Sequence, residues 1–157
     1  MPDGRVYVSR IDNARVARIG PAPGAVPDVD GDEVDDGCDC DATDATAFAV
    51  PAEVPRVRPS GSAPTLGWDP QRAEAGDGTT YVVVSGELSG GVPSACTLQT
   101  GLTEPSYTDP RPNPPIGDGF FYLVRAGNAC GDGTFGDGTG PVDPRDALDA
   151  ALPPTCP

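Results

Sequence analysis

Residues 119–131 read GFFYLVRAGNACG and predict a β-strand with one buried face. Aromatic and β-branched residues are enriched in strands, and the side chains of a strand point alternately to its two faces. One face of this stretch carries only apolar side chains, those of Phe120, Tyr122, Val124 and Ala126. The pattern is typical of a half-buried strand in an antiparallel sheet.

Five further runs of the same kind precede this strand and predict an all-β domain. Gly, Pro, Asp and Ser residues separate them, as expected of turns. The runs are VPRVRP (54–59), PTLGW (64–68), TTYVVVSGEL (79–88), ACTLQ (95–99) and SYTD (106–109). The same alternation predicts four more core side chains, those of Leu66, Trp68, Tyr81 and Val83. Six runs at this spacing favour a β-sandwich, in which two antiparallel sheets pack face to face.

The chain after Phe135 does not continue the strand pattern. A seventh strand is expected there, but residues 136–154 read GDGTGPVDPRDALDAALPP and show no alternation. We expect either a very short seventh strand or another segment in its place, because an unpaired sheet edge invites a partner strand. The sequence DPRD at 143–146 predicts the start of a short helix, with Leu148 and Leu152 four residues apart.

A calcium-binding loop is predicted at residues 28–39, which read DVDGDEVDDGCD. Ca²⁺ takes roughly six to eight oxygen ligands, and a loop of this length supplies them at fixed positions. The predicted ligands are Asp28, Asp30, Asp32, the carbonyl of Val34, Asp36 and Asp39. The sixth position holds Glu33 where such loops have Gly, and the last holds Asp rather than Glu.

The acidic block around this loop has two interpretations. Nine acidic residues and no basic one lie between positions 28 and 44, so the block would repel itself without a cation. Bound metal is the simplest way to order it. The alternative is a disordered acidic linker, which is common for runs of like charge.

Two stretches resemble known families. The acidic loop resembles a thrombospondin type 3 repeat, in which such aspartates are interleaved with cysteines, as Cys38 and Cys40 are here. From about Val50 the chain resembles a fibronectin type III domain: PTLGWDP (64–70) matches strand B, TTYVVVSG (79–86) strand C and GFFYLVRAGNACG strand F. The resemblance implies calcium binding beside a fibronectin type III or immunoglobulin-like sandwich. Together with a terminal Cys-Pro, the arrangement is similar to the C-terminal regions of secreted bacterial surface proteins.

Five cysteines in an acidic chain rich in Gly and Pro predict disulfides and an extracellular location. They lack the paired CxxC spacing of a zinc site. Cys38 and Cys40 are too close in sequence to bridge each other comfortably, and an odd number leaves one thiol free or intermolecular. We expect Cys130 to pair with Cys156, and Cys96 to pair with Cys38 or Cys40; other pairings remain open.

Composition excludes several classes of function. The 157 residues include 24 acidic residues, 10 basic residues and no His, for a formal net charge of −14. We expect no nucleic-acid partner, because phosphate binding needs a cationic surface. We also expect no enzyme activity, because the usual general base is missing and no carboxylate pair is marked out for glycoside hydrolysis. No stretch approaches the ~20 apolar residues of a membrane span.

The chain divides into three parts. Residues 1–20 are predicted to form a β-strand or hairpin, because 5–19 contain two β-branched runs around an Asp-Asn turn. Residues 21–49 form a Pro/Gly linker and the calcium loop, and 50–157 the sandwich with an irregular tail. The sequence shows no signal peptide, so a secreted protein is expected to begin upstream of Met1.

The expected function is that of a non-catalytic structural protein at a bacterial surface. In this interpretation Ca²⁺ braces a β-sandwich subunit, and the N-terminal strand adds to the sheet of a neighbouring copy, which generates a fibre. The alternative is an adhesive or spacer module at the C-terminal end of a larger cell-surface protein, with glycan or protein as its ligand. The two differ in whether residues 1–20 pair between chains or within one.

Overall fold

The computed structural model describes residues 6–10, 15–19, 27–60, 64–137 and 142–157. Within these ranges the elements are β1 (Val6–Arg10), β2 (Arg15–Ile19), β3 (Arg58–Ser60), β4 (Thr65–Gly67), α1 (Arg72–Ala75), β5 (Thr80–Glu87), η1 (Val92–Ser94), β6 (Cys96–Leu102), β7 (Ser106–Thr108), β8 (Phe120–Asn128), β9 (Gly131–Asp132) and α2 (Asp146–Ala150). Strands dominate and the helices are short, which confirms the all-β prediction and the short C-terminal helix. Among the described elements, no helix is long and apolar enough to cross a membrane.

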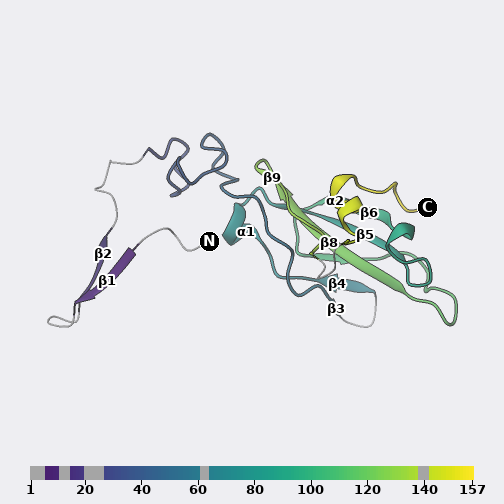
Figure 1. The fold of residues 1–157 in the computed structure, drawn as a ribbon. Helices are drawn as coiled ribbons and strands as arrows, with labels where there is room; N and C mark the ends of the chain where they lie inside the picture. The colour runs from purple at the N-terminus through teal and green to yellow at the C-terminus, as the bar shows by residue number, and fades with distance from the viewer. Residues whose placement is uncertain (1–5, 11–14, 20–26, 61–63, 138–141) are drawn as a thin grey trace.

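The strands of the domain form two antiparallel sheets (Figure 1). One has the order β3-β4-β7 and the other the order β6-β5-β8-β9. The longest pairing joins β5 to β8, from Thr80 opposite Gly127 to Glu87 opposite Phe120. β1 and β2 pair with each other and form a separate two-stranded sheet.

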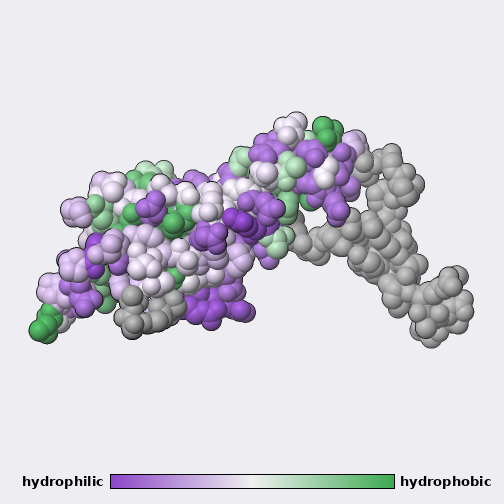
Figure 2. Space-filling model, turned by 180° about the vertical axis from the view of Figure 1, so that it is seen from behind, coloured by the Kyte–Doolittle hydropathy of each residue, from purple (hydrophilic) through white to green (hydrophobic). Residues whose placement is uncertain are grey.

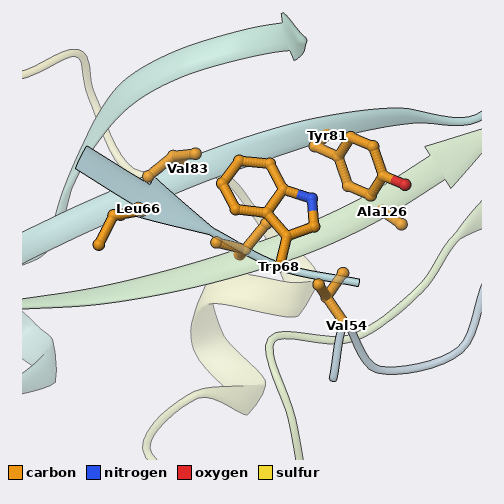
Figure 3. Close-up of a cluster of buried hydrophobic side chains, with 7 residues drawn as sticks. Val54, Leu66, Trp68, Tyr81, Val83 and Ala126 are labelled. Atoms are coloured by element: carbon orange, nitrogen blue, oxygen red, sulfur yellow. The ribbon is translucent and has the colours of Figure 1, made fainter. Parts of the chain in front are cut away.

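Side chains from both sheets meet in one apolar core (Figure 3). The Trp68 ring lies among the other core side chains and meets Tyr81 edge to face, with ring centroids 5.3 Å apart. Aromatic pairs of this geometry stabilise a core beyond the area that they bury. The buried residues of this core are Val54, Leu66, Trp68, Tyr81, Val83, Val124 and Ala126.

Two of the predicted core residues lie at its margin. Tyr122 is half-buried and packs against the core from one side. The prediction for Phe120 is wrong: this residue lies under the guanidinium group of Arg111, 4.1 Å from the ring centroid, and outside the core cluster. The reason is strand length, because β8 has nine residues whereas the facing strands have three each and do not extend to its start.

A second apolar cluster covers the outer face of the larger sheet. Val84 of β5, Phe135 and Leu148 of α2 are buried there. The helix begins at Asp146, later than the DPRD motif predicts, and Leu152 lies beyond its end and is exposed. The tail therefore forms a partial third layer of the domain.

The seventh strand differs from expectation in position. β9 has only two residues and precedes Phe135, whereas the sequence predicted this strand after Phe135. The Phe135 side chain packs on the outer face of the sheet, and its backbone N–H donates to the Asp149 carboxylate at 2.8 Å. The chain leaves the sheet edge because this apolar residue is buried on another layer.

The opposite edge of the sheet is covered by the C-terminal tail. Thr97 of β6 forms a parallel bridge with Thr155. The Thr97 N–H donates to the Pro154 carbonyl at 2.8 Å, and the Cys156 N–H donates to the Thr97 carbonyl at 2.9 Å. The tail thus satisfies backbone groups that a free edge strand would expose.

Two Asp-Pro-Arg segments adopt the same conformation. In each, the carboxylate accepts hydrogen bonds from the backbone N–H and the guanidinium group of the Arg two residues later, at Asp109–Arg111 and at Asp143–Arg145. The intervening Pro restricts the backbone, so less conformational freedom is lost when the pair forms. Asp109 is buried and also accepts a hydrogen bond from the Tyr122 hydroxyl at 2.9 Å.

We expect the Asp109→Asn variant to show a pH-dependent loss of stability. Burial opposes ionisation of Asp109, but the hydrogen bonds from Arg111 and Tyr122 outweigh it, and its pKa is lowered. A lowered carboxyl pKa stabilises the fold above about pH 4, and this contribution is lost as the pH falls through the folded-state pKa. The variant should lose ~1–3 kcal/mol at pH 7 and show a smaller deficit near pH 2 in urea unfolding. A deficit that is constant with pH, or equal to that of the exposed Asp77→Asn, would contradict this prediction.

Candidate acidic loop and sheet edge

The acidic loop is folded by its own carboxylates. Asp28, Asp30 and Asp32 each use one oxygen to accept a hydrogen bond from a backbone N–H two or three residues later, at 2.8, 3.3 and 2.8 Å respectively. Successive turns of this kind curl the chain and direct the carboxylates inward. Figure 2 shows that the surface over this loop is predominantly hydrophilic.

The same three carboxylates form a candidate metal site. Oxygen atoms of Asp28, Asp30 and Asp32 lie within 4.8 Å of one another. The second oxygens of Asp30, Asp32 and Asp39 are buried and have no hydrogen-bond partner. A buried carboxylate oxygen without a donor is costly, and a hard cation with oxygen ligands relieves that cost. The residues present therefore fit a divalent cation such as Ca²⁺.

The electrostatics of Asp30 agree with this interpretation. Burial raises its pKa, and the negative charges of Asp32, Asp39 and Asp28 raise it further, against the effect of a backbone hydrogen bond. Asp39, the last predicted ligand, is one of the charges that raise the pKa of Asp30. A cation at this point would reverse the repulsion and stabilise all four ionised groups.

The two remaining predicted ligands lie outside the group of three carboxylates. Asp36 closes the loop: its side chain accepts the Val29 N–H at 2.9 Å, and its own N–H donates to the Pro27 carbonyl at 2.9 Å. The half-buried Val34 donates its N–H to Asp32. The structure thus groups Asp28, Asp30 and Asp32, leaves Asp39 outside that group, and gives Asp36 a role in folding the loop.

Glu33 adopts the backbone conformation of the Gly that it replaces. Its φ angle is 74°, in the left-handed region that side chains rarely adopt. Gly31, two residues earlier, has a φ angle of 80°. The sharp turn that the sequence pattern predicts at this position is therefore present despite the departure in sequence, at a cost of roughly 1 kcal/mol for the Glu side chain.

Relieving this strain should strengthen metal binding. We expect Glu33→Gly to raise the calcium affinity by about twofold to fivefold, because the turn then forms without a Cβ clash. Gly31→Ala should weaken binding to a similar extent, because Ala is strained at the positive φ angle of this position. An added Cβ would meet no other atom within 4 Å, so a steric clash does not complicate the comparison. Isothermal titration with Ca²⁺ measures both, and Glu33→Gln controls for the lost charge. Equal affinities of the Gly and Gln variants would show that the turn is not strained.

The disulfides tie the loop and the tail to the domain, in pairs other than those predicted. Cys40 is bonded to Cys130, and Cys96 to Cys156. The predicted Cys130–Cys156 pair is wrong. Cys130 lies beside β9 at one edge of the larger sheet, whereas the tail that carries Cys156 runs along β6, where Cys96 lies, at the opposite edge. The predicted bond from Cys96 to Cys38 or Cys40 is wrong for the same reason, and Cys38 is a free, exposed thiol.

The Cys40–Cys130 bond fixes the loop at one end of the sandwich, beside β9 and α1 (Figure 1). Asn128, at the end of β8, donates two hydrogen bonds from its side-chain amide, to the carbonyls of Ala49 at 2.9 Å and Ala75 at 2.8 Å. The end of the acidic block, α1 and the β8-β9 turn are therefore joined. No motif in the sequence marks Asn128 for this role.

The larger sheet has an open edge along the first half of β8. The Leu88 N–H, at the end of β5, donates to the Gly119 carbonyl, so the backbone groups of odd-numbered residues along β8 face β5. The Gly133 N–H, just after β9, donates to the Ala126 carbonyl, so the backbone groups of even-numbered residues face the other side. β9 pairs only with Gly127 and Asn128. The backbone groups of Phe120, Tyr122 and Val124 therefore face an edge that no described strand occupies; we call these three residues the β8 edge.

A cavity of about 310 Å³ lies along this edge. It separates the β8 edge from residues 53–57, which lead into β3. Its apolar lining comes from the two valines of that segment, from Tyr122, Leu123 and Val124, and from Phe135, with Glu53, Arg56 and Arg145 also contributing. The position is the one that a longer seventh strand would occupy.

Comparison with protein-family models, with curated proteins and with solved structures found no match to this chain.

Proposed function

We propose that this chain is a non-enzymatic extracellular structural protein of a bacterial surface, a calcium-braced fibronectin type III-like subunit. Its N-terminal strand joins it to copies of itself in a fibre. The observation that carries the proposal is the β8 edge, which no described strand pairs with, in a protein that also contains a separate two-stranded sheet of β1 and β2. Unpaired edges recruit strands from other chains, and repeated head-to-tail contacts generate filaments.

The strand order supports the fibronectin type III-like assignment. In an immunoglobulin-type sandwich, strands A, B and E share one sheet and strands C, F and G the other. β3, β4 and β7 divide from β5, β8 and β9 in the same way, and β6 adds next to β5. The buried Trp68 of the first sheet packs against Tyr81 of the second, as expected for a core between two sheets.

The acidic loop supports calcium as the brace. Carboxylate oxygens of Asp28, Asp30 and Asp32 converge where the sequence spacing predicts ligands, and Cys40, directly after the loop, forms a disulfide to the domain. When bound, Ca²⁺ would supply charge neutralisation and fix the loop conformation. The side chains that would hold it are those of Asp28, Asp30, Asp32 and Asp39.

The extracellular location is supported by the two disulfides, which persist in oxidising compartments. Absence of His from the sequence supports a role without acid-base catalysis at neutral pH. The strong negative charge keeps free subunits soluble before they assemble.

Electron microscopy of the purified protein tests the proposal. We expect filaments in calcium, no filaments from a chain that begins at Gly20, and looser or shorter filaments in excess chelator. Circular dichroism of the shortened chain controls for misfolding. Monomers under every condition would contradict the fibre and leave the adhesive module as the better explanation.

A further inference from the structure

We propose that the acceptor site for assembly is the β8 edge with its adjoining cavity, and that its occupant is β1 of a second copy of this chain. This inference rests on the proposed function, in which the β8 edge is open, and adds which strand of the N-terminal pair occupies that edge and which cavity receives its side chains. The proposed peptide-binding site is the side of β8 that faces away from β5. The added strand would take the place that β9 leaves empty after two residues.

The other edges of the two sheets are poorer acceptors. The β6 edge is bound by the C-terminal tail through Thr97 and by the Cys96–Cys156 disulfide. β3 and β7 have three residues each, and β3 contains Pro59, which lacks an N–H donor. Among the edges that the structure describes, the β8 edge combines a row of three outward-facing backbone positions with a cavity that can receive side chains.

The β8 edge offers both components of strand recognition. The N–H and C=O groups of Phe120, Tyr122 and Val124 can form a ladder with an added strand, which gives affinity independent of sequence. The cavity beside Tyr122 and Val124 accepts alternate side chains of that strand, which gives specificity. β1 carries Val6 and Val8 two residues apart, a spacing that would place both on one face of the added strand.

Charge and topology favour β1 of a second copy as the occupant. Residues 1–20 hold four of the ten Arg and two of the 24 acidic residues, a net charge of +2, whereas the rest of the chain carries −16. Opposite net charges accelerate the encounter of two copies. The cavity itself is lined by two Arg and one Glu, so its selectivity for the strand rests on its apolar side chains. Among the described strands of one chain β1 pairs with β2 alone, in a two-stranded sheet of a size that is marginally stable by itself in water. Addition to β8 would give this sheet the third strand that it needs.

The test uses the full-length protein at a concentration where it is monomeric, and a fluorescent peptide of residues 4–12 as the probe. We expect saturable binding by fluorescence anisotropy. An N-methyl group removes a backbone N–H donor. Only one edge of an added strand pairs with β8, so methylation of the residues whose N–H groups lie on that edge should abolish binding. We therefore compare a peptide methylated at Val6, Val8 and Arg10 with one methylated at Tyr7 and Ser9. One of them should lose at least about tenfold in affinity and the other should bind like the parent.

Hydrogen exchange then locates the peptide. We expect slower exchange of the Tyr122 and Val124 amides on binding, and no change at Leu123, whose N–H already faces β5. Protection of amides in β3, β6 or β7 instead would contradict the assignment of the β8 edge as acceptor. Filaments formed by subunits that do not bind the peptide would contradict it too. Neither result would contradict the proposal that the protein forms a fibre. Protection of Tyr122 and Val124 in the monomer without peptide would overturn the second-copy assignment. Peptide binding at β8 without filaments would contradict the fibre alone.

Discussion

The Cys40→Ser/Cys130→Ser variant is expected to lose about 2–5 kcal/mol of unfolding free energy. The bond closes a loop between residues 90 apart in sequence, so its removal frees many conformations of the unfolded chain. It also detaches the acidic loop from the β8-β9 turn. For a chain of this size the loss corresponds to a melting temperature lower by roughly 5–20 °C in differential scanning calorimetry.

Cys38→Ser is the matched control for this prediction. Cys38 lies two residues from Cys40 in the same loop, and its thiol is free and exposed. Its substitution should change the unfolding free energy by less than about 0.5 kcal/mol. A loss as large as that of the double variant would show that Cys38 forms the bond. Mass spectrometry of peptides from unreduced protein would identify the pairs directly.

The second large effect is expected from loss of the calcium ligands. In wild-type protein, free Ca²⁺ at a hundred times its dissociation constant should stabilise the fold by ~2.7 kcal/mol. Asp30→Asn and Asp32→Asn should remove most of this effect, because each replaces a carboxylate that has a buried, unpartnered oxygen. Thermal unfolding with calcium or chelator measures the stabilisation, and titration calorimetry measures the affinity.

Asp35→Asn separates a defined site from general attraction to the acidic block. Asp35 is exposed in the same loop, and its backbone carbonyl rather than its side chain accepts hydrogen bonds from the N–H groups of Cys38 and Asp39. The substitution changes the net charge as Asp30→Asn does. We expect nearly unchanged calcium binding. If both variants weaken binding equally, the loop attracts counterions without holding one in place.

Local patterns in the sequence predict the features that depend on local geometry, namely the buried face of a strand and the spacing of carboxylates in a loop. Alternation along 119–131 identifies Val124 and Ala126 as buried because a strand has only two faces. The spacing of Asp28, Asp30 and Asp32 predicts a shared site because the turns of the loop are short. The departure at Glu33 does not change the turn, since the surrounding hydrogen bonds hold it in a left-handed conformation.

Features that join distant segments could not be predicted in the same way. The disulfide pairs depend on which sheet edge each Cys adjoins, and this order follows from the packing of all strands. Phe120 satisfies the alternation but lies beyond the facing sheet, whose strand lengths the pattern did not give. Asp109 is buried because Tyr122 of another segment contacts it. The repeated Asp-Pro-Arg sequence was the one local signal for this pair.

The Cys40–Cys130 bond also determines how the protein would respond to tension. A pull on the two ends travels along the chain to Cys40, crosses the sulfur bridge to Cys130 and continues to the C-terminus. The bridge is the shorter covalent path, so residues 41–129 cannot be drawn out to their full length, which withholds about 300 Å of contour length. In the folded domain the Cys96–Cys156 bond passes part of the load from the C-terminal end to β6. The acidic loop lies within the loaded segment, so under force its cation would act as a reversible clasp while the core remains folded.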